Sequence, residues 1–261
     1  MKLIAVAAAL CTCACTTLGP MPATTAISAV PAGRPSVSMQ AAIVPGFYLS
    51  DSAAQEQHGQ ATGQLSLLFE PDRLLNLPGL IVGARTFGEG GDSVLEPYLG
   101  YRAKAGDGVS IAAVGYGTEA QGAKSSANYE AHRLGAEFAA DVRLLQIGAW
   151  VSLHWQVSAS LTHIAATGNY CIDSTGAGID CSNDSSDTRV NGDVDGSFLA
   201  GTAQVSLDLG HRPVGMLHDI RVALMASAGQ MPMLSFGEQQ PSRATYTSWG
   251  LSLELGLGSE H

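Results

Sequence analysis

The stretch that decides the fold is Val151–Thr162, which reads VSLHWQVSASLT. Every second residue is apolar, and the residues between are Ser, His, Gln and Thr. A β-strand places alternate side chains on opposite faces, whereas a helix would scatter both sets around its circumference. The stretch therefore predicts an amphipathic strand.

The same alternation recurs along the chain, clearly in some stretches and more weakly in others. Near the C-terminus, Trp249, Leu251 and Leu253 alternate with Ser248, Gly250 and Ser252. No stretch has convincing helical periodicity. We predict ten strands, at Ser36–Ser50, 60–69, Gly79–Phe87, 95–104, Val109–Thr118, Tyr129–Leu144, Ala149–Thr162, 199–209, Asp219–Gly229 and 248–257.

Two architectures are built from such strands. A soluble barrel or sandwich turns its apolar face inward, whereas a membrane barrel turns it outward to lipid. Several of the stretches exceed the roughly 5–6 residues typical of soluble sheets and suit a tilted membrane crossing of about 9–11 residues. Their polar face is mostly Ser, Thr, Gln and Gly, which favours a crowded lumen over a water-facing surface.

The connections between the predicted strands alternate in length. Those after odd strands are mostly long: 51–58, 88–93, 119–128, 169–195 and 230–244. Those after even strands are mostly shorter: 71–78, 105–108, 145–146 and 211–218. Long outer loops and short periplasmic turns are typical of membrane barrels.

With this pattern, residues 36–258 resemble a small bacterial outer-membrane β-barrel. The resemblance implies an all-β fold: a single closed, antiparallel, up-and-down transmembrane barrel of about ten strands, with a polar lumen and an apolar exterior. It also implies an outer-membrane location, extracellular long loops, periplasmic termini and lipid as the main partner. Outward aromatic residues near strand ends could form the interfacial girdles; the candidates are Phe69, Tyr101, Tyr116 and Trp249.

The N-terminus has the features of an export signal. Lys2 precedes the apolar run Leu3–Leu10, and small residues follow, which is typical of a signal peptide at residues 1–15. The segment also resembles a lipoprotein signal, in which Cys15 would be lipidated and Cys13 fits less well; an ordinary signal containing cysteines remains the alternative. Residues 16–35, rich in Thr, Pro and Ala, form a predicted linker.

Composition and cysteine positions narrow the function further. Charged residues are 14% of the chain and the formal net charge is -10, which argues against nucleic-acid binding. Cys171 and Cys181 lie in the acidic stretch 169–195, where an exported protein would form a disulfide. Because binding surfaces concentrate on loops held by rigid scaffolds, this loop is the predicted surface for a partner.

The inward faces of the predicted strands carry charges of both signs. In a confined space such charges should pair, and removal of one partner would leave the other poorly solvated. We interpret them as a structural filling of the lumen, with a narrow pore as the alternative. The predicted network comprises Arg85, Glu96, Arg102, Arg133, Glu137, Asp141, Arg143, Asp208 and Glu254.

No residue is assigned to catalysis, a metal or a cofactor. Ser152 and His154 share one face two positions apart, so contact between them is allowed, but a lumen position near the periplasmic end is a poor place for a substrate. We therefore expect an ordinary hydrogen-bonded lumen histidine. Asp193 and Asp195 are weak calcium candidates, because the spacing lacks the bidentate Glu of an EF-hand loop.

The favoured function is that of an outer-membrane barrel with a structural or surface-interaction role, without catalysis. The first alternative is a lipid-anchored periplasmic barrel that encloses an apolar ligand, and the second is a narrow pore or an outer-rim hydrolase. The orientation of the two strand faces distinguishes the favoured function from the first alternative. Ser152, His154 and Gln156 face the lumen in a membrane barrel and bulk water in a soluble one.

Overall fold

The computed structural model describes residues 36–44, 47–49, 62–71, 77–89, 92–124, 127–148, 151–172, 188–209, 217–232 and 243–258. All of their regular structure is β. Within these ranges, no helix is long and apolar enough to cross a membrane. The strands are β1 (Ser36–Val44), β2 (Phe47–Leu49), β3 (Thr62–Glu70), β4 (Leu80–Glu89), β5 (Asp92–Gly106), β6 (Val109–Lys124), β7 (Ala127–Ile147), β8 (Val151–Ile172), β9 (Thr188–Leu209), β10 (Leu217–Pro232) and β11 (Arg243–Gly258).

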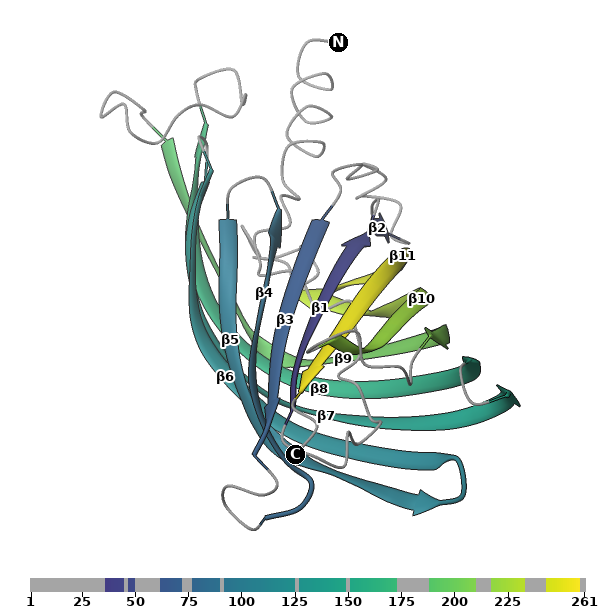
Figure 1. Ribbon diagram of the computed structural model, residues 1–261. Coiled ribbons are helices and arrows are strands. Elements are labelled where there is room, and N and C mark those ends of the chain that lie inside the picture. Colours follow the sequence, from purple (N-terminus) through teal and green to yellow (C-terminus); the bar gives the residue numbers. More distant parts are fainter. Residues whose placement is uncertain are drawn as a thin grey trace.

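The strands form one closed antiparallel barrel (Figure 1). From β3 to β11 each strand pairs with the next in sequence, and β1 pairs with both β3 and β11. The three residues of β2 pair with β11 and extend the line of β1, so the closed wall has ten positions. The predicted up-and-down barrel of ten strands is confirmed. Where all ten positions of the wall pair, closure leaves no free sheet edge, which a membrane would not tolerate; the distal ends of β6 and β9 extend beyond their pairing with β5 and β10.

The two rims of the barrel are distinguished by the strand ends that lie at each. At one end Ser36 pairs with Gly258 and with Glu70, so the first and last strands share this end, which we call the terminal rim. Two glycines in the left-handed region also lie there, Gly108 (φ 73) between β5 and β6 and Gly148 (φ 61) directly after β7. The opposite end is the distal rim.

The wall nearer the terminal rim is apolar outside and polar inside. On β8, Trp155 and Leu161 face outward and are about half exposed, whereas His154 and Gln156 on the opposite face are buried. The inward polar face and outward apolar face of the predicted membrane barrel are therefore confirmed. The soluble alternative fails, because it requires these two faces to be exchanged.

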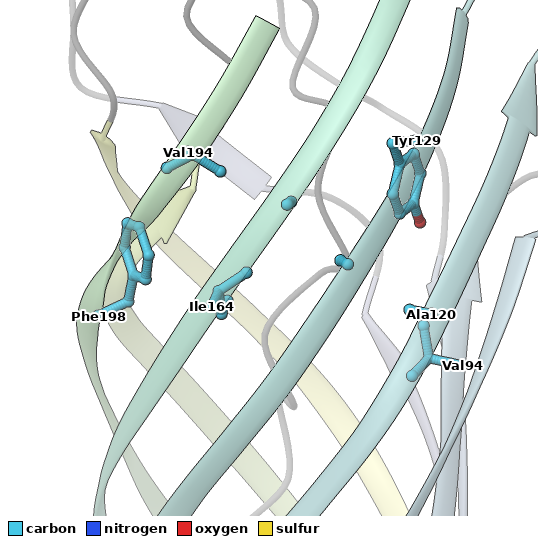
Figure 2. Packing of buried hydrophobic residues seen from close by; sticks show 8 residues of the cluster. Val94, Ala120, Tyr129, Ile164, Val194 and Phe198 are labelled. Atoms are coloured by element: carbon cyan, nitrogen blue, oxygen red, sulfur yellow. The ribbon is translucent and has the colours of Figure 1, made fainter.

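Toward the distal rim the two faces reverse. The outward residues of β7–β9 become polar, with His132, His163 and Asp195 all exposed. The inward residues become apolar and form a buried cluster (Figure 2): Val94, Ala120, Tyr129, Ala131, Ile164, Ala166, Val194 and Phe198. This is the pattern of a wall whose outer face meets water, so the distal ends of these strands project beyond the apolar band.

This projection corrects two predicted loops. The predicted connection 169–195 is strand at both ends, because β8 continues to Ile172 and β9 begins at Thr188. The predicted connection 119–128 is also mostly strand, since β6 runs to Lys124 and β7 begins at Ala127. The reversal of the faces is the physical reason: the alternation continues, but with apolar residues on the other side.

One predicted girdle residue is also placed wrongly. Phe69, Tyr101 and Trp249 are exposed on the outer face, but Tyr116 is buried inside. Tyr116 belongs to the inward set of β6 with Ala112 and Val114, because the small residues Ala113, Gly115 and Gly117 occupy the outward positions beside it. The larger side chain therefore lies in the lumen.

Candidate functional site: the charged lumen

The middle of the lumen holds a compact group of charges from three strands. Arg85 on β4 donates from Nε to Glu96 Oε1 at 2.6 Å and from Nη1 to Glu137 Oε2 at 2.8 Å. Arg133 on β7 forms a second ion pair with Glu96, with its Nη1 3.4 Å from Oε2. Arg85 and Glu96 are almost fully buried, at 1% and 0% exposure. Because a buried charge without a partner is costly, each of these four residues depends on the others.

Two inward tyrosines pack beside this group. The Arg85 guanidinium lies over the Tyr116 ring, with Cζ 4.6 Å from the ring centroid, a favourable cation–π distance. The Tyr116 hydroxyl on β6 lies 2.6 Å from Thr162 Oγ1 on β8, so the tyrosine side chain passes over β7 on the inner face of the wall. Tyr98 donates to the carbonyl oxygen of Leu67 at 3.0 Å. The rings thus pack on the inner face of the wall, and their hydroxyl groups have hydrogen-bond partners.

Two further groups of charges lie closer to the terminal rim. Arg102 and Glu70 form a bidentate pair through Nε and Nη2, and both are buried. Arg221 on β10 donates to Asp208 Oδ2 at 3.1 Å, and its Nη1 lies 3.5 Å from Glu254 Oε2. Arg221 stands opposite Asp208 and Glu254 in the strand register, so period-two alternation alone brings the three side chains together.

A fourth polar group lies on β7 and β8. His154 Nδ1 is 2.7 Å from Asp141 Oδ1, and His154 Nε2 is 2.8 Å from Ser152 Oγ. His154 and Asp141 are buried, and Ser152 is partly exposed. Each ring nitrogen therefore has its own partner, a carboxylate on one side and a hydroxyl on the other.

Eight of the nine residues predicted for the lumen network lie inside the barrel in these groups. Arg143 does not: its side chain is exposed, and Nη1 donates to Gln146 at 3.5 Å. The strand register shifts between Arg143 and Leu145, at the terminal rim, and this irregularity breaks the inward alternation of β7. The predicted inclusion of Arg143 in the lumen network was therefore wrong.

Two members of these groups, Glu70 and Arg221, were missed from the sequence, although they continue the inward sets of β3 and β10. His154 was predicted to lie in the lumen, but its carboxylate partner was not. The signal for Arg221 was available, because Arg221, Ala223, Met225 and Ser227 occupy alternate positions. Asp141 as the partner of His154 required the register of β7 against β8, which no single-strand pattern contains.

The calcium candidates occupy the outer face of β9. Asp193 and Asp195 are exposed, and Asp195 Oδ1 lies 3.5 Å from His163 Nε2. Within the ranges that the structure describes, no three His, Cys, Asp or Glu residues are grouped as metal ligands. Of the predicted disulfide, Cys171 lies in β8, while Cys181 and the lipidation candidate Cys15 fall outside the described residues.

These features define the class of the protein. A closed barrel with apolar side chains exposed to the outside and buried charges within is a transmembrane β-barrel. This architecture confirms the resemblance to the small bacterial outer-membrane barrels.

Comparison with known proteins adds structural neighbours only. No family model and no curated protein matches the chain. Neisserial surface protein A (NspA) is 11% identical with a TM-score of 0.34, over 85% of this chain and 96% of that chain. Ail, the attachment invasion locus protein of Yersinia pestis, is 9% identical with a TM-score of 0.33, over 86% of this chain and 99% of that chain. The outer membrane protease OmpT from Escherichia coli is 7% identical with a TM-score of 0.26, over 90% of this chain and 99% of that chain. Similarity this low supports no statement about a ligand, partner or activity.

Proposed function

We propose that the protein is an integral barrel of the bacterial outer membrane with a structural or surface-interaction role and a lumen closed by its own side chains. The observation that carries the proposal is that the same strands have an apolar outer face and a charged inner face. Large apolar side chains such as Leu134, Phe138 and Leu161 are more than half exposed outside. The charges inside are buried and paired.

The extent of the exposed apolar surface supports contact with lipid. Outward apolar residues occur on every long strand of the wall, whereas soluble monomers rarely expose patches above a few hundred Å². On β8 the outward apolar run extends from Val151 to Leu161. Its length agrees with a tilted membrane crossing of about 9–11 residues. The exterior thus supplies membrane anchoring.

The closed lumen argues against an open pore. Arg85, Glu96, Glu137 and Arg133 extend from β4, β5 and β7 and meet one another inside the barrel. Tyr98 and Tyr116 add bulk at the same level. A small barrel has an interior just wide enough for side chains to fill, so this cross-section leaves little room for a permeating solute.

The surface role is assigned to the distal side. The proposed orientation puts the terminal rim in the periplasm and the projecting ends of β7–β9 outside the cell. The connection 173–187 then joins two projecting strands, and a Cys171–Cys181 disulfide would restrain it. A signal peptide at residues 1–15, with Cys15 as the lipidation candidate, would supply export and a second anchor.

Heat-modifiable electrophoretic mobility of the outer-membrane fraction tests this proposal. A folded barrel should resist cold SDS and change its mobility after boiling, and surface protease should cut the connection 173–187 in intact cells. A protein that is released by salt washing and shows no mobility change would contradict the membrane proposal. A barrel cut only from the periplasmic side would contradict the orientation.

A further inference from the structure

The hydrogen-bonded series Ser152–His154–Asp141 has a geometry that the structural role does not use. We propose that these three residues form a nucleophilic site that hydrolyses small acyl esters, reached from the terminal rim of the lumen. The inference goes beyond the proposed function, because it adds an activity to a barrel that needs none.

The strand geometry explains how the three groups meet. Ser152 and His154 are two positions apart on β8 and so project from one face. Asp141 on β7 stands opposite Gln156, which makes it the diagonal neighbour of His154 across the paired strands. The resulting distances are 2.8 Å from Ser152 Oγ to His154 Nε2 and 2.7 Å from His154 Nδ1 to Asp141 Oδ1.

This arrangement assigns a role to each ring nitrogen. With the proton on Nδ1, His154 donates to Asp141 and accepts the hydroxyl proton of Ser152 at Nε2. That is the arrangement in which a histidine acts as general base toward a serine while a carboxylate holds its tautomer. The same three chemical groups in this order recur on unrelated folds, so the arrangement is recognised by geometry.

Burial distinguishes the nucleophile from its supports. Asp141 is 1% exposed and His154 is 7% exposed, whereas Ser152 is only partly buried. Ser152 is also the second residue of β8, next to the terminal rim. A small ester entering from that rim therefore meets the hydroxyl before it meets the imidazole or the carboxylate.

The neighbouring strand supplies a hydroxyl for the developing negative charge. Ser206 stands opposite His154 in the register and is buried, and its Oγ has no hydrogen-bond partner within the described strands. Asp208 stands opposite Ser152 and would oppose an oxyanion, but Arg221 binds this carboxylate at 3.1 Å. Ser206 is therefore the candidate donor to the oxyanion, with the Arg221 cation nearby.

The reaction balances without any further reagent than water. Ser152 Oγ adds to the acyl carbon while its proton passes to His154 Nε2 and the carbonyl electron pair moves to oxygen. Collapse breaks the ester C–O bond, and the leaving alkoxide takes the proton from His154. Water then adds to the acyl-Ser152 ester by the same route, and the products are one carboxylic acid, one alcohol and the free serine.

The first experiment uses the full chain, folded in detergent, with a fluorophosphonate probe and p-nitrophenyl acetate. We expect covalent labelling at Ser152 and ester turnover. Ser152→Ala should abolish both, whereas Ser158→Ala, on the same strand and face, should leave both unchanged. Folding of each variant is checked by its heat-modifiable mobility. A folded wild-type protein that the probe does not label, or that Ser152→Ala leaves equally labelled, would overturn the proposal.

The second experiment separates Asp141 as a positioning residue from Asp141 as a structural one. Asp141→Asn should lower kcat on the order of 10³- to 10⁴-fold, as loss of the carboxylate does in serine–histidine–aspartate sites. KM should change little, because Asp141 does not touch the substrate. An unchanged kcat in the folded variant, or a loss confined to KM, would contradict this role. Failure of the ester assays with a normal mobility change would leave the membrane barrel intact, so the two proposals fail separately.

Discussion

The ring of Tyr116 lies over Gly135, its register partner across β6 and β7, so closely that a β-carbon at Gly135 would be 2.6 Å from ring atoms Cε2 and Cζ. The same relationship joins Gly83 and Tyr98, where the added carbon would be 2.3 Å from Cζ. An inward glycine therefore makes room for a large ring on the neighbouring strand. This pairing is how a narrow lumen accommodates two tyrosines beside Arg85.

Gly135→Ala should destabilise the barrel by about 1–3 kcal/mol, the usual effect of overpacking, because the rigid Tyr116 ring must move. Gly201→Ala is the matched control, since its added carbon would meet only the carbonyl oxygen of Ser158, at 3.4 Å. Urea unfolding in lipid vesicles measures the difference. Equal free energies of unfolding for the two variants would refute the close packing.

Arg85→Met should cost about 3–5 kcal/mol, because it leaves Glu96 and Glu137 buried with one cation removed. Adding Glu137→Gln should recover part of the loss, since one uncompensated carboxylate disappears. Arg143→Met is the control and should change stability by less than about 0.5 kcal/mol, as expected for an exposed position. If Arg143→Met proved as harmful as Arg85→Met, the placement of these charges would be wrong.

Leu161→Arg should destabilise the barrel by about 2–4 kcal/mol if Leu161 faces the hydrocarbon, whereas an arginine near the interface costs about 0–1 kcal/mol. His163→Arg tests the second case, because His163 is the next outward residue of β8 and pairs with Asp195 beyond the apolar band. Vesicle unfolding titrations compare both with the wild-type protein. Equal losses of stability at the two positions would contradict a membrane boundary between Leu161 and His163.

If Arg85, Glu96 and Glu137 close the lumen as we propose, the wild-type protein should give no conductance steps in a planar bilayer. The triple replacement of these residues by serine removes both the bulk and the ion pairs, and we expect discrete openings from it. Steady steps from the unmodified barrel would favour the narrow pore that the sequence left as an alternative.

Much of the architecture could be predicted from single strands. The alternation in Val151–Thr162 identifies both faces of β8, and its repetition predicts ten strands. It could not predict the length of β7–β9, because the apolar and polar sides exchange near Leu134, Thr162 and Leu199. A strand prediction that requires apolar residues on the outer face ends where the surroundings of that face change from lipid to water.

The site was predictable in composition and less so in partners. Inward parity identified most of the lumen charges, but Arg143 departed from it at the register shift beside the terminal rim. The partner of His154 was not predictable, because Asp141 reaches it diagonally from another strand. Tyr116 was misplaced because parity alone does not say which face of a strand carries the bulk when its outward neighbours are Gly and Ala.

The most direct test of the membrane barrel is quenching of tryptophan fluorescence by brominated phosphatidylcholine. In a Trp150→Phe variant the emission comes from Trp155 and Trp249, which are 45% and 51% exposed on the outer face. We predict strong quenching by the brominated lipid and weak quenching by aqueous acrylamide. Emission insensitive to the brominated lipid in vesicle-bound, folded protein would show that these side chains do not face the hydrocarbon, and would contradict the account.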